Sequence, residues 1–339
     1  MSNLKPFYDA DGVTIYNGDC LEVMPHLEKQ SVQLVCSDPP YFKVKAEWWD
    51  HQWETPAAFL DWFHQISLHW FQLLAGNGSL YVFASPQMAW DVERKIRERF
   101  AVLNRITWRK SAGRHDGCDK SALRCFFPQT ESLIFAEHWP EVSGENERNA
   151  YQQGCDQAAR DVFGRYIREV RERHGLTMKQ LTAAVGAHGK TNHGGACSNW
   201  ERGYNVPTPL FYDRLQAKFP GCFDRTFQDL KAQYEDLKAQ YEADRRPFQA
   251  TPRRPFTDVW DFDPVKPSKH KHPCQKPRAL LEHIVLTSTR EGDTVLDSFG
   301  GSMTLARVCR DHGRRFIGIE IEKHWCEQAV NRLSQKALF

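Results

Sequence analysis

The chain has 339 residues, 41% of them hydrophobic, which is enough for one large α/β domain and a second module. Its 45 lysines and arginines face 43 acidic residues, so any basic surface must come from local clusters of charge. No segment approaches the run of about 20 apolar residues that spans a membrane, which predicts a cytoplasmic protein without membrane contact. The ten cysteines are scattered and form no C-x-x-C pair, a pattern that predicts no metal site.

The first 140 residues alternate strands and helices in the rhythm of a parallel α/β sheet. Short apolar runs at 13–16 and 32–35 predict two strands joined by a helix. An amphipathic helix is expected over 59–74, ended by the glycines at 76–78. Further on, the pattern predicts a strand at 79–85, a helix at 88–100 and strands at 105–111 and 131–138.

Residues 141–255 predict a helical insert within the α/β domain. The segment 141–160 is polar and aperiodic, as a linker is, and an amphipathic helix is expected at 163–175. Thr177 and Gln180 form a capping box for a second helix. Two more helices are expected at 196–202 and from 207, and a repeated heptad, DLKAQYE, fills 229–242. The repeat favours a packed helix or a duplicated linker over a short coiled coil.

The α/β pattern returns at residue 256 and continues to residue 339. A helix is expected at 279–289, and a strand from residue 294 runs into the glycine turn that ends at 302. A helix at 303–313 and a strand at 314–322 complete the pattern. The sequence therefore predicts one α/β domain built from 1–140 and 256–339.

Acidic residues follow three of the predicted strands. Asp297 ends one strand before Gly300 and Gly301, which suit close approach of a nucleotide-like ligand to bare backbone. Glu320 ends the next strand, where an acid can bind ribose hydroxyls. A G-x-G-x-x-G pattern is absent, which disfavours a pyrophosphate cofactor. Asp38 follows the strand at 32–35 and opens the rigid sequence DPPYF.

Five motifs resemble those of S-adenosylmethionine-dependent amino-methyltransferases of DNA, in the circularly permuted order called the β class. In chain order they are NGDCLE (17–22), SDPPYF (37–42), HPCQKP (272–277), VLDSFGGSMT (295–304) and FIGIE (316–320). The resemblance covers about 220 of the 339 residues. It implies the fold of a class I methyltransferase, a Rossmann-like, mixed but mostly parallel sheet, here with an all-α insert.

The resemblance assigns the chemistry to Asp38, Pro39, Pro40 and Tyr41. An exocyclic amine of a base is a poor nucleophile, because its lone pair is delocalised into the ring. The Asp38 carboxylate and the Pro39 carbonyl would accept its two N–H groups, while the prolines hold that carbonyl fixed. Tyr41, with Phe42 as a second candidate, would stack on a base rotated out of the duplex.

The resemblance also implies S-adenosylmethionine as the cofactor. Asp19 would accept a hydrogen bond from its adenine, Glu320 would bind its ribose and Phe299 would attract its sulfonium. Three departures from the family pattern concern this site: Ser298 replaces a usual Pro, Met303 a frequent Gly and Cys274 a usual Thr. The full expected set is Asp19, Cys20, Asp38, Asp297, Phe299, Gly300, Gly301, Ser302 and Glu320.

The insert resembles the helix-turn-helix of Cro-like repressors, through Leu181, Val185, Gly186, Trp200, Glu201 and Gly203. Its turn is longer than usual, and Gly194 and Gly195 stand where the reading helix should begin. A helical packing unit without DNA contact is the alternative. The DNA contacts expected here and in the basic segment 105–124 are Arg109, Lys110, Arg114, Lys190, Asn192, Ser198, Asn199 and Arg202.

Together these features predict a methyltransferase that modifies the N6 of adenine in double-stranded DNA. Asp before Pro-Pro-Tyr favours adenine, and cytosine N4 is the near alternative. A DNA-binding regulator on an inactive methyltransferase scaffold is a second alternative, and methylation of RNA or of a protein amide is a third. The sequence leaves open the recognition site, a homodimer and a cognate restriction system.

Overall fold

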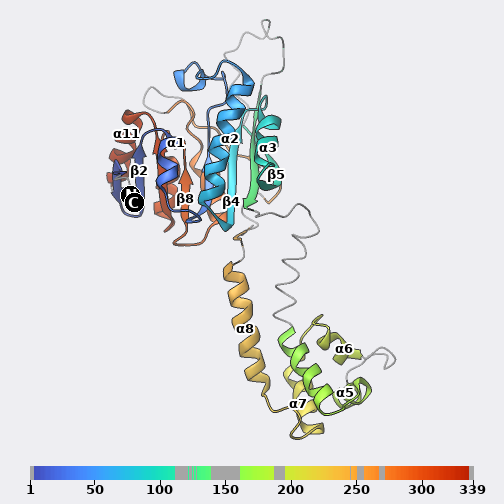
Figure 1. The fold of residues 1–339 in the computed structure, drawn as a ribbon. Helices are drawn as coiled ribbons and strands as arrows, with labels where there is room; N and C mark the ends of the chain where they lie inside the picture. The colour runs from blue at the N-terminus through green and yellow to red at the C-terminus, as the bar shows by residue number, and fades with distance from the viewer. Residues whose placement is uncertain are drawn as a thin grey trace. The chain divides into compact units, whose positions relative to one another are not determined.

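The computed structural model describes residues 4–110, 121, 124, 126, 128–138, 161–186, 195–244, 246–249, 256–266 and 272–335. Contacts divide the chain into two compact units. The sheet unit comprises Met1–Glu141 and Arg246–Phe339, and the helical unit comprises Val142–Arg245. Each unit has hydrophobic core residues of its own. Figure 1 shows the sheet of the first unit and the helices of the second.

The sheet unit is built on a mixed sheet that, within the described residues, has nine strands in the order β1-β2-β9-β8-β3-β4-β6-β5-β7. The central strands from β2 to β4 run parallel, while β6 is antiparallel to both β4 and β5. This arrangement confirms the predicted, mostly parallel fold. The strands are β1 Tyr8–Ala10, β2 Val13–Asn17, β3 Val32–Ser37, β4 Leu74–Ala84, β5 Phe100–Arg109, β6 Thr130–His138, β7 Val259–Asp261, β8 Thr294–Asp297 and β9 Arg315–Glu320.

Helices cover both faces of this sheet and make a three-layer structure (Figure 1). Successive residues of a strand point to opposite faces, so Leu34 and Cys36 join one core while Val35 joins the other. One layer consists of α1 Cys20–Val23, α2 Pro56–Leu73 and α3 Ala89–Ile96. The other consists of α9 Arg278–Ser288, α10 Thr304–Asp311 and α11 Lys323–Ser334.

Two predicted boundaries on the N-terminal side were wrong. Helix α2 begins where the Thr55 hydroxyl accepts the Ala58 N–H at 3.2 Å, and it ends at Leu73. The glycines at 76–78 do not stop it, because they already belong to strand β4. Helix α3 ends at Ile96 rather than at residue 100, since buried Phe100 pairs with His138 in the sheet. Strands β1 and β7 and helix α11 were not predicted.

The helical unit packs around one apolar cluster. Its described helices are a stretch over 161–173, α5 Met178–Val185, α6 Gly195–Glu201, α7 Pro209–Lys218 and α8 Phe227–Asp244. The predicted capping box of Thr177 and Gln180 is confirmed at the start of α5. In α8, Leu230 is buried in the cluster and Tyr234 and Leu237 pack against it. The first heptad and Leu237 therefore pack on their own unit, which agrees with the packed helix, one of the two interpretations favoured by the sequence.

The chain leaves the sheet unit after β6 and re-enters it at Arg246. Arg246 Nε lies 2.9 Å from Glu137 Oε2, near the end of β6. The guanidinium also lies over the rings of Phe135 and Phe248, at 5.1 and 5.6 Å from their centroids. The residues that flank the helical unit in the sequence are thus joined within the sheet unit.

Candidate active site

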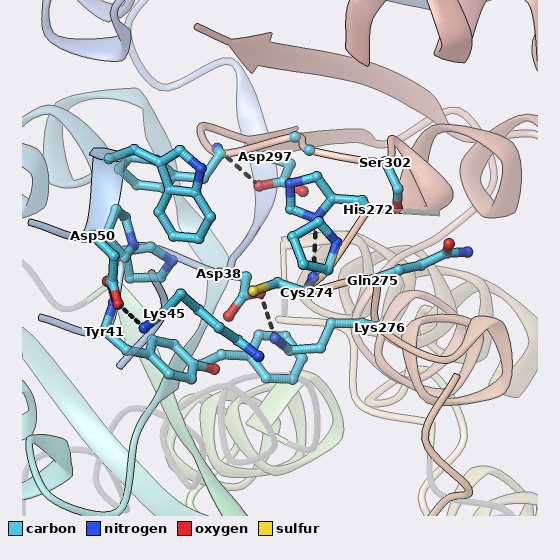
Figure 2. A pocket seen from close by; sticks show the side chains of 18 of the residues that line it. Asp38, Tyr41, Lys45, Asp50, His272, Cys274, Gln275, Lys276, Asp297 and Ser302 are labelled. Atoms are coloured by element: carbon cyan, nitrogen blue, oxygen red, sulfur yellow. Dashed lines mark hydrogen bonds and ion pairs between the residues drawn. The ribbon is translucent and has the colours of Figure 1, made fainter. Parts of the chain in front are cut away.

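A pocket of about 460 Å³ opens in the sheet unit at the carboxyl ends of β2, β3, β8 and β9 (Figure 2). Strands β3 and β8 are neighbours in the sheet. From β3 the chain continues to β4 on one side, and from β8 it continues to β9 on the other side. Ligands of open α/β sheets bind at such a switch point, outside the carboxyl ends of the strands. The acids predicted from the sequence, Asp38, Asp297 and Glu320, all line this pocket.

Asp38 follows β3 and lines the pocket. Its Oδ2 accepts a hydrogen bond from Lys276 Nζ, while its Oδ1 is buried and has no partner among the described residues. Burial raises the pKa of Asp38, and the ammonium of Lys276 opposes that rise. Pro39 and Pro40 are buried behind it and fix the backbone on which the carboxylate stands.

Four alternating charges form a network along one wall of the pocket: Asp38, Lys276, Glu131 and Lys110. Lys276 Nζ also lies 3.6 Å from Glu131 Oε2, and Glu131 Oε1 accepts a hydrogen bond from Lys110. Burial alone would raise the pKa of Glu131, but the two ammonium groups outweigh it and lower that pKa. The network carries no net charge and holds Lys276 against Asp38.

Two members of this network had no assigned role in the sequence interpretation. Lys276 stands in the HPCQKP motif, and Glu131 lies on β6. Lys110, expected to contact DNA, lies in the pocket wall with only 14% of its side chain exposed. Tyr41 is linked to the same network, because its hydroxyl donates to Glu131 Oε2 at 3.1 Å.

The segment after Tyr41 is held by Asp50, which is fully buried. The Asp50 carboxylate accepts the backbone N–H groups of Tyr41 at 2.7 Å and of Val44 and Lys45 at 2.6 Å each. These bonds turn the chain back on itself next to Phe42, whose φ is +60°. The Phe42 ring packs against Phe59 in the core, with 5.8 Å between the ring centroids, so of the two aromatic candidates for stacking only Tyr41 lines the pocket.

Asp297 and Glu320 stand at the ends of β8 and β9. Asp297 Oδ1 accepts the Ser37 hydroxyl at 3.2 Å and the Phe299 N–H at 3.1 Å, and burial raises the pKa of Asp297 to about 7. Glu320 accepts the Gly301 N–H at 2.6 Å, and burial raises the pKa of this carboxyl as well. Both acids therefore sit where a positively charged or hydroxyl-bearing ligand would relieve the cost of their burial.

The turn after β8 lies close under His272. A Cβ atom on Gly301 would meet the His272 ring at 3.1 Å. The ring stacks on Trp49 and meets Trp325 edge-on, at centroid distances of 6.4 and 4.8 Å. His272 Nδ1 accepts the Cys274 N–H at 3.2 Å, and burial above all lowers the pKa of His272 to about 4, so the imidazole is neutral.

Two departures from the family pattern have a structural account. Ser298 accepts the indole N–H of Trp70 at 3.0 Å and lies 2.9 Å from the Ser37 hydroxyl, so it joins β3, β8 and α2. Met303 adopts a left-handed backbone conformation, with φ of +52°, where glycine is favoured. Its thioether fills the space above Gly300, since a Cβ there would collide with the Met303 sulfur. The turn is thus supported from its own helix.

The other expected cofactor residues also line the pocket. Asp19 caps α1 by accepting the Leu21 N–H at 2.8 Å, and Cys20 is buried next to it. Phe299 lies 5.6 Å from Trp62, centroid to centroid. Ser302 is buried, with its hydroxyl 2.9 Å from that of Thr304. The structure therefore brings the whole expected set together.

The residues expected to contact DNA are divided between the two units. Arg109 is exposed and forms an ion pair with Asp261 at 2.5 Å. Ser198 and Asn199 lie on α6, and exposed Arg202 follows that helix. Two arginines of the helix at 161–173 are bound to Glu201. Arg168 donates to the Glu201 backbone carbonyl, and Arg171 donates to the Glu201 carboxylate. The expected contacts Arg114, Lys190 and Asn192 lie outside the described residues.

The described residues contain no group of three or more His, Cys, Asp or Glu side chains that could hold a metal ion. The cysteines in the same part of the chain are free thiols: Cys20, Cys36, Cys197, Cys222, Cys274, Cys309 and Cys326. Nor does any described helix combine the length and apolar character needed to cross a membrane.

A mostly parallel sheet with a ligand pocket at its switch point and acids at the ends of neighbouring strands defines the class I methyltransferase fold. Residues 32–331 match the N6/N4 family described as DNA methylase, and the chain belongs to this family. It is 24% identical to the DNA adenine methyltransferase YhdJ of Escherichia coli K12, over 96% of this chain and 84% of the relative. It is also 24% identical to the type II methyltransferase M2.DpnII of Streptococcus pneumoniae, over 97% and 92%.

The solved PvuII DNA methyltransferase, described as cytosine-N4-specific, shares the fold with a TM-score of 0.56 and 13% identity, over 99% of this chain and 92% of that one. As a family member the chain is a DNA methyltransferase, and its cofactor is S-adenosylmethionine. The pocket fits this cofactor, because the glycine turn and the buried acids Asp297 and Glu320 line it, and a cationic ligand with ribose hydroxyls would relieve the cost of burying those acids.

Proposed function

We propose that the enzyme methylates the N6 amine of adenine in double-stranded DNA. The observation that carries this proposal is the buried Oδ1 of Asp38, which has no hydrogen-bond partner within the described residues, on a side chain that lines the pocket together with Tyr41. A buried acceptor without a donor costs about 1–3 kcal/mol, and an amine N–H from the substrate would remove that cost. When bound, S-adenosylmethionine supplies an electrophilic methyl group.

Asp38 Oδ1 accepts one N–H of the target amine and takes the proton that this nitrogen loses. The Pro39 carbonyl accepts the second N–H, so the lone pair turns out of the plane of the base. Lys276 holds Oδ2 and keeps the carboxylate oriented. Tyr41, fixed through Asp50 and Glu131, stacks on the base that has left the duplex.

Adenine is favoured over cytosine by Asp at position 38 and by the relative named as a DNA adenine methyltransferase. Cytosine N4 is the alternative, and the PvuII enzyme is described as specific for it. Mass spectrometry of nucleosides from DNA treated with the enzyme decides between them. N6-methyladenine supports the proposal, and N4-methylcytosine in its place refutes it.

The role of Asp38 is tested with Asp38→Ala. Transfer of a tritiated methyl group should fall by at least about a thousandfold, while calorimetric affinity for S-adenosylmethionine stays within a few-fold, because the carboxylate acts on the amine. Asp61→Ala, a change at an exposed residue of α2, is the matched control and should methylate normally. Normal transfer by Asp38→Ala would refute the mechanism.

We further propose that the helical unit reads DNA through a Cro-like helix-turn-helix. The capped α5 and the exposed polar residues Asn199 and Arg202 at α6 support this interpretation. Replacing 142–245 by a short Gly/Ser linker should weaken duplex binding and flatten its salt dependence, by about 0.9 in slope for each phosphate that the protein no longer neutralises. An unchanged slope and affinity would leave the unit a structural insert.

The partners follow from this activity. The type II methyltransferases among the relatives support a restriction-modification setting, in which a nuclease cuts the same site when it is unmodified. We place the enzyme in the cytoplasm, where it meets its DNA, and leave a homodimer as an outcome for sedimentation analysis. Methylation-aware sequencing of DNA from cells that express the chain identifies the site.

A further inference from the structure

The pocket contains an ammonium group that the four-charge network does not use. Lys45 lines the pocket, and Figure 2 shows its side chain extending into it from the backbone beside Asp50. Its backbone N–H donates to Asp50 Oδ2 at 2.6 Å, and its carbonyl lies 2.7 Å from His51 Nε2. The root of the side chain is therefore fixed on a rigid turn.

The tip of this side chain has no counter-ion among the residues that the structure describes. Two other lysines of the pocket wall are paired, Lys276 with Asp38 and Lys110 with Glu131, while Lys266, which also lines the pocket, is exposed. Within the described ranges no hydrogen bond or ion pair reaches Lys45 Nζ. The four-charge network is neutral, so Lys45 adds a positive charge beside it, in a pocket that is also lined by the carboxylates of Asp297 and Glu320. The field of Lys45 reaches His272, whose pKa is lowered by burial and by the neighbouring cations.

The side of the pocket on which Lys45 stands distinguishes two ligands with anionic oxygens. Figure 2 shows Tyr41 and Lys45 on one side of Asp38, and Ser302 and Gln275 on the other. The glycine turn, Asp297 and Ser302 hold the cofactor in the proposed function, so the cofactor and its carboxylate belong to that other side. The side of Tyr41 receives the nucleotide, which brings a phosphate with its base.

We propose that Lys45 binds a backbone phosphate of the nucleotide whose base enters the pocket. This inference rests on the proposed function, because it needs a nucleotide in the pocket, and it assigns to Lys45 a role separate from chemistry. A point charge on a fixed root suits a phosphate, which accepts from any direction. Binding there would place the base at Tyr41 and offset part of the cost of taking it out of the stack.

The experiment compares Lys45→Gln with wild type in titrations of a fluorescein-labelled duplex. The duplex carries, in unmethylated form, the site that the enzyme modifies, and the salt concentrations are about 50, 100 and 200 mM. Loss of one phosphate contact should make the negative slope of log K against log salt shallower by about 0.9. Between about 50 and 200 mM salt, the factor by which the variant loses affinity should then be about 3.5 times smaller than the factor for wild type. Lys45→Arg, which keeps the charge, should restore most of the slope.

The matched control is Lys29→Gln, an exposed residue before β3 and therefore at the opposite end of that strand from Asp38. It removes the same charge and should keep the wild-type slope. If Lys45→Gln keeps that slope too, the proposal is overturned. Circular dichroism of each variant checks that the fold is intact, and Lys45→Met offers a second uncharged side chain.

A calorimetric arm separates the phosphate from the carboxylate of the cofactor. S-adenosylhomocysteine carries that carboxylate, and 5′-methylthioadenosine lacks it. Lys45→Gln should bind both as wild type does. Selective loss of affinity for S-adenosylhomocysteine would assign Lys45 to the carboxylate of the cofactor and overturn the proposal that it binds a phosphate. Wild-type protein that binds neither compound and transfers no methyl group would instead refute the proposed function.

Discussion

Asp297→Asn should stabilise the protein free of cofactor, and by more as the pH rises. Burial raises the pKa of Asp297 from 3.8 to about 7. At 1.36 kcal/mol for each pKa unit, the ionised carboxylate costs the folded state about 4 kcal/mol. An asparagine at this position keeps an oxygen for the Ser37 hydroxyl and the Phe299 N–H, and it carries no charge.

The sign follows from the direction of the shift. A pKa raised in the folded state contributes stability that is complete below pH 3.8 and is lost as the pH rises through 7. Between about pH 5 and pH 8 the variant should therefore gain about 2.7 kcal/mol in free energy of unfolding over wild type. Urea titrations at about pH 5, 6.5 and 8 measure this difference.

The control for this experiment is Asp11→Asn, the same chemical change on an exposed residue. A difference between Asp297→Asn and wild type that stays constant across this pH range would refute the reasoning. The corollary concerns function. Because the cofactor is cationic, it should bind wild type more tightly at about pH 8 than at about pH 6, and this pH dependence should weaken in Asp297→Asn.

Two further predictions concern the turns that shape the pocket. Met303→Ala and Met303→Gly both lose the packing on Gly300, but only Met303→Gly relieves the strain of the left-handed backbone. Urea titration should therefore find Met303→Gly more stable than Met303→Ala by about 1 kcal/mol, and the reverse order would contradict the role of φ. Asp50→Asn leaves one of three backbone N–H groups without an acceptor, so it should cost about 2–3 kcal/mol and reduce methyl transfer, while calorimetry finds unchanged cofactor affinity.

The sequence predicted the features that depend on local pattern. Asp38, Asp297 and Glu320 follow strands whose apolar runs are plain, so their meeting at one edge of the sheet could be foreseen. Gly76 misled the interpretation, because glycine often ends a helix, yet here the strand begins at Leu74 and runs through it. The edge strands β1 and β7 have three residues each, too few to show the alternation of apolar and polar residues that identifies a strand in a sequence.

Contacts between distant segments could not be predicted. Lys276 and Asp38 are 238 positions apart, and Glu131 lies on a strand that carries no family motif. Asp50 has only short-range partners, but its role depends on a backbone turn that no residue pattern announces. Such contacts arise from the fold, which brings together side chains that the sequence keeps far apart.

The pairing of Arg246 with Glu137 has an evolutionary consequence. Both ends of the excursion between β6 and the return of the chain are anchored by residues of the sheet itself, so the sheet does not need the excursion in order to close. Loop-closure entropy grows only with the logarithm of length, and a tenfold change in length alters it by about 2 kcal/mol. An insert of another length could therefore replace the helical unit at this point of the chain without rebuilding the catalytic site.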